Sequence, residues 1–294
     1  MSRLLVTGAS GFVGAALARR LVELGHEVHL VLRPESAAPA LGPSVQLHRH
    51  DGSTAGLADI VRTAAPDAVF HLASLFLAAH TPADVERLVT SNVLFSTQLA
   101  EAMAGADVRL LVNTGTSWQH YEDAQYDPVN LYAATKQAFD AILRYYSAAA
   151  GLRVATLKLF DTYGPGDPRP KLLHLLKKTA LSGAALAMSP GEQLIDIVHI
   201  DDVVAAFVLA WERLRDGAQA EAMADYAVSS GAPLPLRELA ALYARVTGLP
   251  LNIEWGGRAY RNREVMRPWT QGRPLPGWAP QVPLEEGIAR FHAA

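Results

Sequence analysis

Short runs of aliphatic and β-branched residues alternate with longer segments of helical periodicity along this chain. Apolar runs bounded by turn residues predict buried strands, and apolar residues spaced three and four apart predict amphipathic helices. The pattern predicts strands at residues 4–6, 28–32, 68–71, 110–112, 153–160 and 194–200. It predicts helices at residues 15–24, 57–64, 83–104, 131–149, 171–182 and 203–213. This alternation indicates an α/β fold with a Rossmann-type, doubly wound parallel sheet.

A segment rich in proline and glycine, residues 162–170, marks the expected boundary between two lobes. We expect residues 1–165 to form a dinucleotide-binding Rossmann domain, to which residues 194–230 return. Residues 166–193 and 231–294 are then expected to form a smaller α/β lobe that binds the substrate.

The composition argues against several classes of binding partner. The formal net charge is −3, so the chain lacks the basic excess that favours nucleic-acid binding. It contains no cysteine, which excludes disulfides, a thiolate nucleophile and cysteine-ligated metal, and we predict no metal site. No apolar stretch approaches the roughly 20 residues of a membrane span, and no secretory-signal pattern follows Met1. We therefore expect a cytoplasmic protein without a membrane partner.

Residues 4–14, LLVTGASGFVG, lie where the first strand passes into the first helix. Glycine at such a turn lets backbone amides and the helix N-terminus approach a pyrophosphate. The glycines are spaced three apart, as in the short-chain dehydrogenase/reductase superfamily. The turn residues expected to contact a dinucleotide are Gly8, Ser10, Gly11, Phe12, Val13 and Gly14.

The end of the second strand should select the dinucleotide, because a carboxylate there accepts from a ribose diol whereas an arginine binds a 2′-phosphate. Arg33 occupies this place, and no acidic residue precedes Glu35. We predict NADP(H) rather than NAD(H), the alternative being an ordinary solvated arginine.

Tyr132 and Lys136 lie four residues apart on a predicted helix, so their side chains share one face. An ammonium beside a phenol favours the phenolate and is expected to lower the tyrosine pKa from about 10, which would suit acid–base catalysis. A hydroxyl should follow the preceding strand to polarise a substrate oxygen. Thr116 is the first choice for this hydroxyl, with Thr114 and Ser117 as alternatives.

Three segments resemble the extended short-chain dehydrogenase/reductases of the nucleotide-sugar epimerase/dehydratase family. They are residues 113–121 (NTGTSWQHY), 131–139 (LYAATKQAF) and 158–165 (KLFDTYGP). More narrowly, they resemble CDP-abequose synthase-like reductases of NDP-4-keto-6-deoxyhexoses. The similarity covers nearly the whole chain, with one departure at Ile195, where many members carry a phosphate-binding arginine.

The resemblance implies further site residues. Those near the cofactor are Asp51, Gly52, Leu72, Ala73, Ser74 and Asn92. Those near the nucleotide-diphosphate sugar are Ser117, Trp118, Gln119, His120, Asp161, Gln193, Arg261 and Arg263. Arg169 and Lys171 could assist, although an exposed basic helix explains Lys171 equally well. The family also implies a homodimer formed through the helices at residues 83–104 and 131–149.

By resemblance, the expected reaction in deoxysugar biosynthesis is NADPH-dependent reduction of the sugar C4 ketone. Tyr132 would supply the proton, Thr116 would polarise the ketone, and Lys136 would hold the cofactor ribose and tune Tyr132. A 4,6-dehydratase is disfavoured, because Thr116 and Ser117 stand where dehydratases carry an Asp–Glu pair. An NAD(P)-dependent 4-epimerase is the alternative enzyme, and a dinucleotide-sensing binding protein is the alternative without catalysis.

Overall fold

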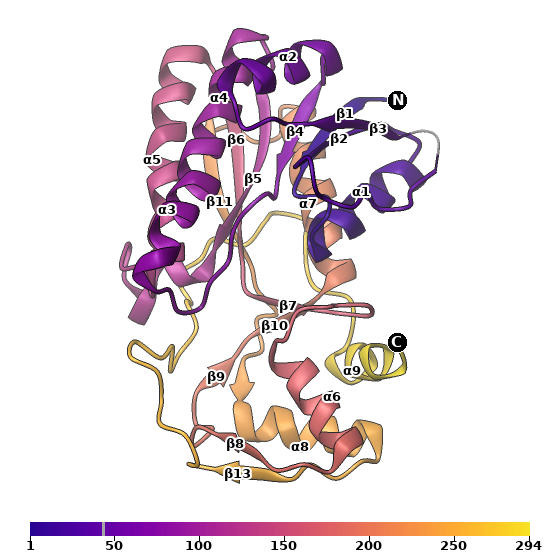
Figure 1. Ribbon diagram of the computed structural model, residues 1–294, viewed down its shortest axis with the longest axis vertical. Coiled ribbons are helices and arrows are strands. Elements are labelled where there is room, and N and C mark those ends of the chain that lie inside the picture. Colours follow the sequence, from indigo (N-terminus) through magenta and orange to yellow (C-terminus); the bar gives the residue numbers. More distant parts are fainter. Residues whose placement is uncertain (43–44) are drawn as a thin grey trace.

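The computed structural model describes residues 1–42 and 45–294 and divides into two lobes (Figure 1). The larger lobe contains a seven-stranded sheet in the order β11-β6-β5-β4-β1-β2-β3, with every neighbouring pair parallel. Its strands are β1 (Arg3–Thr7), β2 (Glu27–Leu32), β3 (Val45–Arg49), β4 (Ala68–His71), β5 (Leu110–Thr116), β6 (Arg153–Leu159) and β11 (Met223–Val228). The predicted fold class, an α/β Rossmann-type parallel sheet, is confirmed.

Helices cover both faces of this sheet, because its strands are apolar on both sides. On one face α1 (Phe12–Glu23) and α7 (Ile200–Arg215) pack against alternate strand residues such as Leu4 and Val6. On the other face α2 (Thr54–Ala64), α4 (Phe95–Gly105) and α5 (Leu131–Ala150) enclose a second core that includes Leu5. Because the strands are parallel, their carboxyl ends lie at one edge of the sheet.

Two predicted elements are divided in the structure. The expected helix over residues 83–104 consists of a 3-10 turn (Pro82–Asp84), α3 (Val85–Val89), a π-helical turn (Thr90–Leu94) and α4. The expected strand over residues 194–200 is divided into β9 (Leu194–Ile195) and β10 (Ile197–His199). Asp196 separates these two strands because its buried carboxylate accepts hydrogen bonds from the Ser229 hydroxyl and the Ser230 amide.

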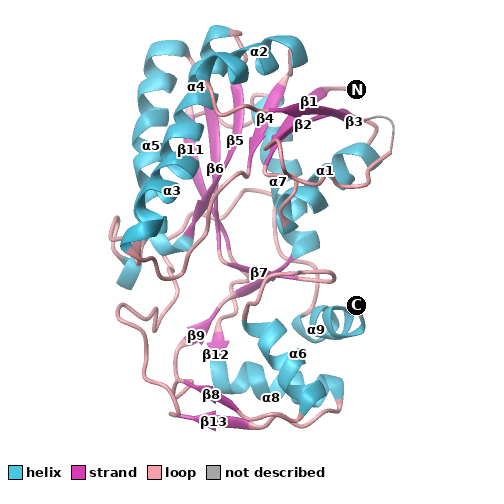
Figure 2. Cartoon of the chain, viewed as in Figure 1, coloured by secondary structure: helices cyan, strands magenta, loops and turns pink. Residues whose placement is uncertain are grey.

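The smaller lobe has its own apolar core, formed by α6 (Leu172–Ser182), α8 (Leu236–Thr247) and α9 (Leu284–Ala293). Short strands pair as β8 (Leu186–Met188) with β13 (Ile253–Trp255), and as β9 with β12 (Leu234–Pro235) (Figure 2). The parallel pair of β7 (Asp161–Tyr163) and β10 lies where the two lobes meet. Within the described ranges, no helix is both long and apolar enough for a membrane crossing.

Candidate active site

The turn between β1 and α1 requires its glycines. Gly8 has a φ of +77°, and a Cβ atom there would lie 2.5 Å from the Ala73 backbone nitrogen. A Cβ on Gly14 would overlap the Gly8 carbonyl. Gly11 is the N-cap of α1 and offers no side chain to the first amides of that helix. This uncovered helix N-terminus suits a pyrophosphate, so the turn fits the predicted dinucleotide.

The neighbouring strand ends carry Arg33 and Asp51. Arg33 follows β2, is 77% exposed at its side chain and forms an ion pair with Glu35 at 3.3 Å. Asp51 follows β3, and its carboxylate accepts hydrogen bonds of 2.8 Å from both the amide and the hydroxyl of Ser53. These bonds hold the pKa of Asp51 below its usual range. Gly52, with a φ of +91°, follows in the turn before α2.

The loop after β4 is held against the glycine turn. The Ala73 amide donates to the Thr7 hydroxyl at 3.2 Å. The ring of His71 forms 2.8 Å hydrogen bonds to Thr7 on one side and to Ser96 of α4 on the other. Burial lowers the pKa of His71 to about 3, so this histidine is a neutral structural link. Leu72 and Ala73 therefore lie directly beside Gly8.

Asn92 braces the same loop from the π-helical turn. Its side-chain oxygen accepts from the Leu75 amide (2.7 Å) and the Ser74 hydroxyl (3.2 Å). Its side-chain nitrogen donates to the Leu75 carbonyl and the Thr135 hydroxyl, both at 3.0 Å. These bonds use both amide hydrogens and both oxygen lone pairs. Asn92 therefore positions Ser74 in the loop that lies beside the glycine turn.

Tyr132 and Lys136 both lie on the buried side of α5, whose first turn is capped by Asn130. Burial raises the pKa of Tyr132 to about 12, opposed by a hydrogen bond with Ser74 and by the charge of Arg169. Burial lowers the pKa of Lys136 to about 8, opposed by Asp140. The prediction that Lys136 lowers the tyrosine pKa is wrong for this structure, because desolvation of the phenolate dominates. Tyr132 is therefore a protonated phenol at neutral pH.

The three candidate hydroxyls differ in their partners. The Thr114 hydroxyl donates to the His71 carbonyl at 2.8 Å, inside the sheet. The Thr116 hydroxyl, at the end of β5, accepts from the Trp118 amide at 3.3 Å. An accepting hydroxyl keeps its own hydrogen for another group, so Thr116 can still donate. Ser117 is buried in the 3-10 turn that follows.

An aromatic group lies beside Tyr132. Phe76 packs edge-on against the Tyr132 ring, with centroids 5.0 Å apart, and its centroid is 5.6 Å from that of Trp118. The Lys171 ammonium lies 5.5 Å from the Phe76 centroid and 3.0 Å from the Asp161 carboxylate. Trp118 and Asp161 are thus connected to Tyr132, Trp118 through Phe76 and Asp161 through Lys171 and Phe76. Sequence reasoning missed Phe76, which is 43% exposed, because no motif contains it.

Three expected substrate contacts point elsewhere. Gln119 is 0% exposed, because the 3-10 turn Ser117–Gln119 directs its amide under α5. The His120 ring is buried and stacks on Trp269, with centroids 3.9 Å apart. Gln193 is buried in the smaller lobe, where its amide donates to Ser189 at 3.0 Å. These three residues support neighbouring segments and do not line an open surface.

The arginines near the lobe boundary also lie in different environments. Arg263 forms an ion pair with Asp127 and lies over the Tyr121 ring, 4.2 Å from its centroid, so it attaches its segment to the larger lobe. Arg261 is exposed. Arg169 lies 4.7 Å from the centroid of Phe12, directly over the glycine turn. Of the basic residues at the lobe boundary, Arg169 therefore lies beside the predicted cofactor turn, and Lys171 lies beside Phe76, next to Tyr132.

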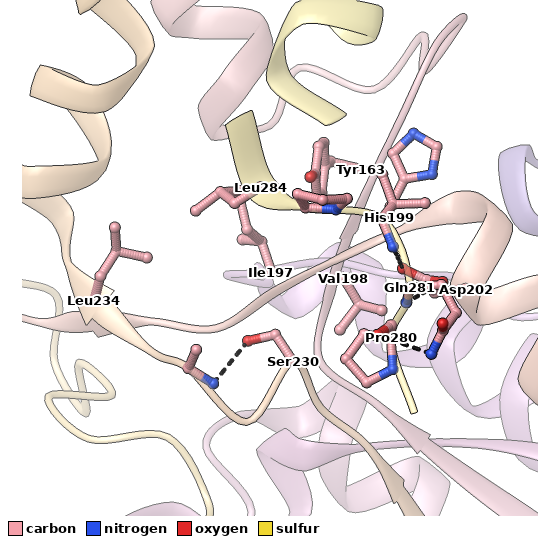
Figure 3. Close-up of a pocket in the computed structure, with 13 residues that line it drawn as sticks. Tyr163, Ile197, Val198, His199, Asp202, Ser230, Leu234, Pro280, Gln281 and Leu284 are labelled. Atoms are coloured by element: carbon pink, nitrogen blue, oxygen red, sulfur yellow. Dashed lines mark hydrogen bonds between the residues drawn. The ribbon is translucent and has the colours of Figure 1, made fainter. Parts of the chain in front are cut away.

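A separate cavity of about 270 Å³ lies between the β7–β10 pair and the C-terminal segment (Figure 3). Tyr163, His199 and Asp202 line it together with Ser230 and Gln281. None of the residues predicted for the active site lines this cavity. Its walls come from both lobes, which makes it a feature of their junction.

Comparisons with known proteins agree with this geometry. The model of the NAD dependent epimerase/dehydratase family matches residues 4–226. A UDP-glucose 4-epimerase of Mycolicibacterium smegmatis is 31% identical over 313 residues, covering 98% of this chain and 96% of the relative. A CDP-abequose synthase of Salmonella typhimurium is 25% identical and covers 97% and 95%. The solved structure of MoeE5 with UDP-glucuronic acid and NAD has a TM-score of 0.84 at 27% identity, covering 99% and 97%.

The chain belongs to the NAD dependent epimerase/dehydratase family. The resemblance seen in its motifs is confirmed, and the protein is an enzyme that uses a nicotinamide dinucleotide. This finding favours catalysis over the dinucleotide-sensing alternative. The site combines a helix N-terminus that suits a pyrophosphate with a protonated phenol, a buried lysine and a strand-end hydroxyl. The phenol can add a proton to a carbonyl oxygen, and the hydroxyl can donate a hydrogen bond to it.

Proposed function

We propose that this enzyme reduces the C4 ketone of an NDP-4-keto-6-deoxyhexose, with NADPH as the reductant. The observation that carries the choice of NADPH is Arg33, an exposed guanidinium at the end of β2 beside the glycine turn. A guanidinium binds a 2′-phosphate with parallel hydrogen bonds. A reductase must exchange its dinucleotide at each turnover, and an NADP(H)-selective site fits that use.

The catalytic roles follow from the protonation states. When bound, the reduced nicotinamide supplies the hydride to the ketone carbon. Tyr132 holds its proton at neutral pH because its pKa is raised to about 12, so it can donate to the ketone oxygen. Thr116 donates a hydrogen bond to the same oxygen. Lys136, buried in the next turn of α5, would hold the ribose of the bound cofactor.

The substrate is proposed to be a nucleotide-diphosphate sugar, as in the relatives named for such reactions. Ile195 removes one expected arginine from the diphosphate site. Arg169 and Lys171 lie beside Phe12 and Phe76 and can supply positive charge there. Trp118 and Phe76 would contact the apolar face of the sugar ring.

A nucleotide-sugar 4-epimerase is the second candidate. Its specific support is the 31% identity to a UDP-glucose 4-epimerase, which exceeds the 25% identity to the CDP-abequose synthase. An epimerase would use the same tyrosine in both directions, because it oxidises and then reduces one carbon. It would leave the total of reduced nicotinamide unchanged.

One experiment separates the two reactions. Purified protein is mixed with NADPH and a panel of NDP-4-keto-6-deoxyhexoses, and the absorbance of the reduced nicotinamide is followed. In parallel, UDP-glucose and UDP-galactose are incubated with the protein and NAD, and the sugars are separated by chromatography. Consumption of NADPH with a ketosugar supports the reductase. Interconversion of the UDP-sugars without such consumption would replace it with the epimerase.

We further propose a cytoplasmic homodimer. The helices α3 and α5 lie on one flank of the larger lobe (Figure 1), with apolar side chains exposed at Val85, Val89, Leu94 and Tyr145. A second copy that covered this flank would bury these groups. Sedimentation analysis should give twice the mass of the chain, and a monomer at micromolar concentration would remove the proposal.

A further inference from the structure

A buried carboxylate lies one helical turn beyond the catalytic lysine. Asp140 follows Lys136 by four residues on α5, so both side chains lie on the inner face of the helix. Asp140 is buried, and three groups contact its carboxylate. The Gln119 amide donates at 2.8 Å, the Asn113 amide donates at 3.4 Å, and the Lys158 ammonium lies at 3.5 Å.

The first connection runs from Asp140 to Lys136. Lys136 is buried, and its charged form is disfavoured there; the negative charge of Asp140 opposes this effect. His71 of β4 also faces Lys136, but its strongly lowered pKa leaves it neutral. Asp140 is therefore the anionic group among the described residues that acts most directly on Lys136.

The second connection runs from Asp140 to the catalytic hydroxyl. The Gln119 amide nitrogen donates to Asp140, and the Gln119 oxygen accepts from the Thr116 backbone amide at 3.0 Å. The remaining Gln119 hydrogen goes to Gln137 at 2.7 Å. Every hydrogen bond that this fully buried side chain can donate is thus committed, so its orientation fixes Thr116 relative to α5.

Other charged residues lie near Asp140 and Lys158. Lys158 of β6 lies between Asp140 and Asp225 of β11, at 3.5 Å and 3.2 Å. Asp225 is half exposed and accepts no hydrogen bond from Gln119 within the part of the chain that the structure describes. Burial lowers the pKa of His120, and the charge of Lys158 lowers it further. Asp140 joins this charge network to Lys136 and, through Gln119, to Thr116.

We infer that Asp140 and Gln119 are positioning residues of the active site. Asp140 keeps Lys136 charged inside the protein, and Gln119 transmits the position of Asp140 to Thr116. The inference rests on the proposed roles of Lys136 and Thr116, but its first test requires no substrate.

The chain contains five lysines, so the ε-carbon resonances of lysine-labelled protein can be followed individually by NMR as the pH is raised. Lys136→Met assigns the resonance of Lys136. In Asp140→Asn, that resonance should titrate about one pH unit lower than in the wild type. Asp225→Asn is the matched control, because it removes the same charge from the same Lys158 and should leave the Lys136 midpoint unchanged. An unchanged midpoint in Asp140→Asn would overturn the first connection.

A second variant tests the same connection if Asp140→Asn does not fold. Asp140→Leu combined with Lys158→Met replaces the buried ion pair by apolar groups, an exchange that proteins often tolerate. The Lys136 midpoint should fall here also, because the anion is removed. Asp140→Glu, which keeps the charge, should restore the wild-type midpoint. A double variant that titrates like the wild type would again contradict the inference.

The connection to Thr116 is tested by turnover. Gln119→Met keeps the side-chain volume but removes both bridging hydrogen bonds. It should lower kcat about tenfold with little change in KM, because the hydroxyl is misplaced relative to Tyr132. Gln137→Ala, which removes the other partner of Gln119, is the control and should keep kcat within about twofold. Equal kcat values for both variants would overturn this connection. If the wild type turns over no nucleotide sugar, the proposed function fails while the lysine titration still decides the role of Asp140.

Discussion

Arg33 determines, in our proposal, which dinucleotide the site accepts, because it is the first charged side chain after β2. In Arg33→Asp we expect the Kd for NADPH to rise at least about tenfold, since a carboxylate repels the 2′-phosphate. The Kd for NADH should change much less. Fluorescence titration with each dinucleotide measures this difference. Glu35→Gln, which removes only the ion-pair partner of Arg33, is the control and should retain NADPH binding. Equal losses for the two dinucleotides would remove Arg33 from 2′-phosphate recognition.

Lys136 should make stability depend on pH in a direction that can be calculated. A pKa lowered from 10.5 to about 8 costs about 3 kcal/mol of folding free energy while the lysine is charged in both states. This cost is complete below pH 8 and decreases as the folded-state lysine loses its proton. The raised pKa of Tyr132 acts oppositely, but only above pH 10, where the unfolded tyrosine ionises.

Lys136→Met should therefore be more stable than the wild type near neutral pH, by about 3 kcal/mol, while catalysis falls by at least about a hundredfold. The stability difference should shrink between pH 8 and pH 10. Urea unfolding at several pH values measures it. The exposed Lys178→Met should differ from the wild type by less than about 0.5 kcal/mol throughout. A difference that is constant or grows with pH would contradict the burial of a charged Lys136.

Individual site residues could be predicted from sequence where a turn or a helix fixes the number of residues between them. Gly8 and Gly14, and Tyr132 with Lys136, were identified because a turn and a helix place residues at known separations. For Gln119, the resemblance of residues 113–121 to the family predicts a place near the nucleotide sugar. Its true direction depends on a single 3-10 turn that buries it under α5, and no sequence periodicity reports such a turn.

The π-helical turn Thr90–Leu94 is the element that aims Asn92 at the loop after β4. Asn92→Ala would leave the partly buried backbone groups of Leu75 and the buried Thr135 hydroxyl without this partner, at a cost of about 3 kcal/mol. We also expect a lower kcat, because Ser74 and its hydrogen bond with Tyr132 lose their support. Chemical unfolding and turnover assays measure the two effects.

Thr97→Ala is the matched control for Asn92. Thr97 lies on the adjoining helix α4, and its hydroxyl donates to the Val93 carbonyl at 2.8 Å, within the same helical segment. This variant should cost no more than about 1 kcal/mol and should retain kcat. Similar losses in both variants would show that Asn92 stabilises only the helix, without supporting the active-site loop.

Five strands of the central sheet, β1, β2, β4, β5 and β6, were predicted from sequence because their buried aliphatic residues stand out from the helical pattern. The edge strands β3 and β11 were not predicted, since polar residues interrupt both of them. The short strands β7, β8, β12 and β13 were not predicted, since two or three residues carry no periodicity. Helix α9 was hidden in a tail rich in proline and tryptophan. These elements depend on contacts between distant segments, such as the parallel pairing of β8 with β13.

At the scale of the whole molecule, the segment from Trp278 to α9 connects the larger lobe with the smaller lobe. The Trp278 indole donates to the Asp202 carbonyl at 2.9 Å, on the helix α7 of the larger lobe. The Asp202 carboxylate accepts from the amides of Gln281 and Val282 at 2.8 Å and 3.1 Å. Farther along, Ile288 and Phe291 of α9 enter the core of the smaller lobe. Asp202 thus links the two lobes that the substrate must bridge in the proposed function.

Asp202→Ala should therefore loosen the smaller lobe while leaving the dinucleotide turn intact. Two charge-assisted hydrogen bonds from partly buried amides are lost, worth about 3 kcal/mol together. Amide hydrogen exchange should increase through the tail segment and α9, and the KM for the nucleotide sugar should rise several-fold with the Kd for the dinucleotide unchanged. Asp201→Ala is the control, because this neighbouring aspartate forms an exposed ion pair with Arg290 of the same α9, worth less than about 1 kcal/mol, and, within the described residues, lies 3.5 Å from the His199 ring without bonding to the tail segment. Equal amide hydrogen exchange in the two variants, or a loss of dinucleotide binding together with substrate binding, would contradict this prediction. The lobes would then be joined by their apolar contacts, and Asp202 would not set their relative position.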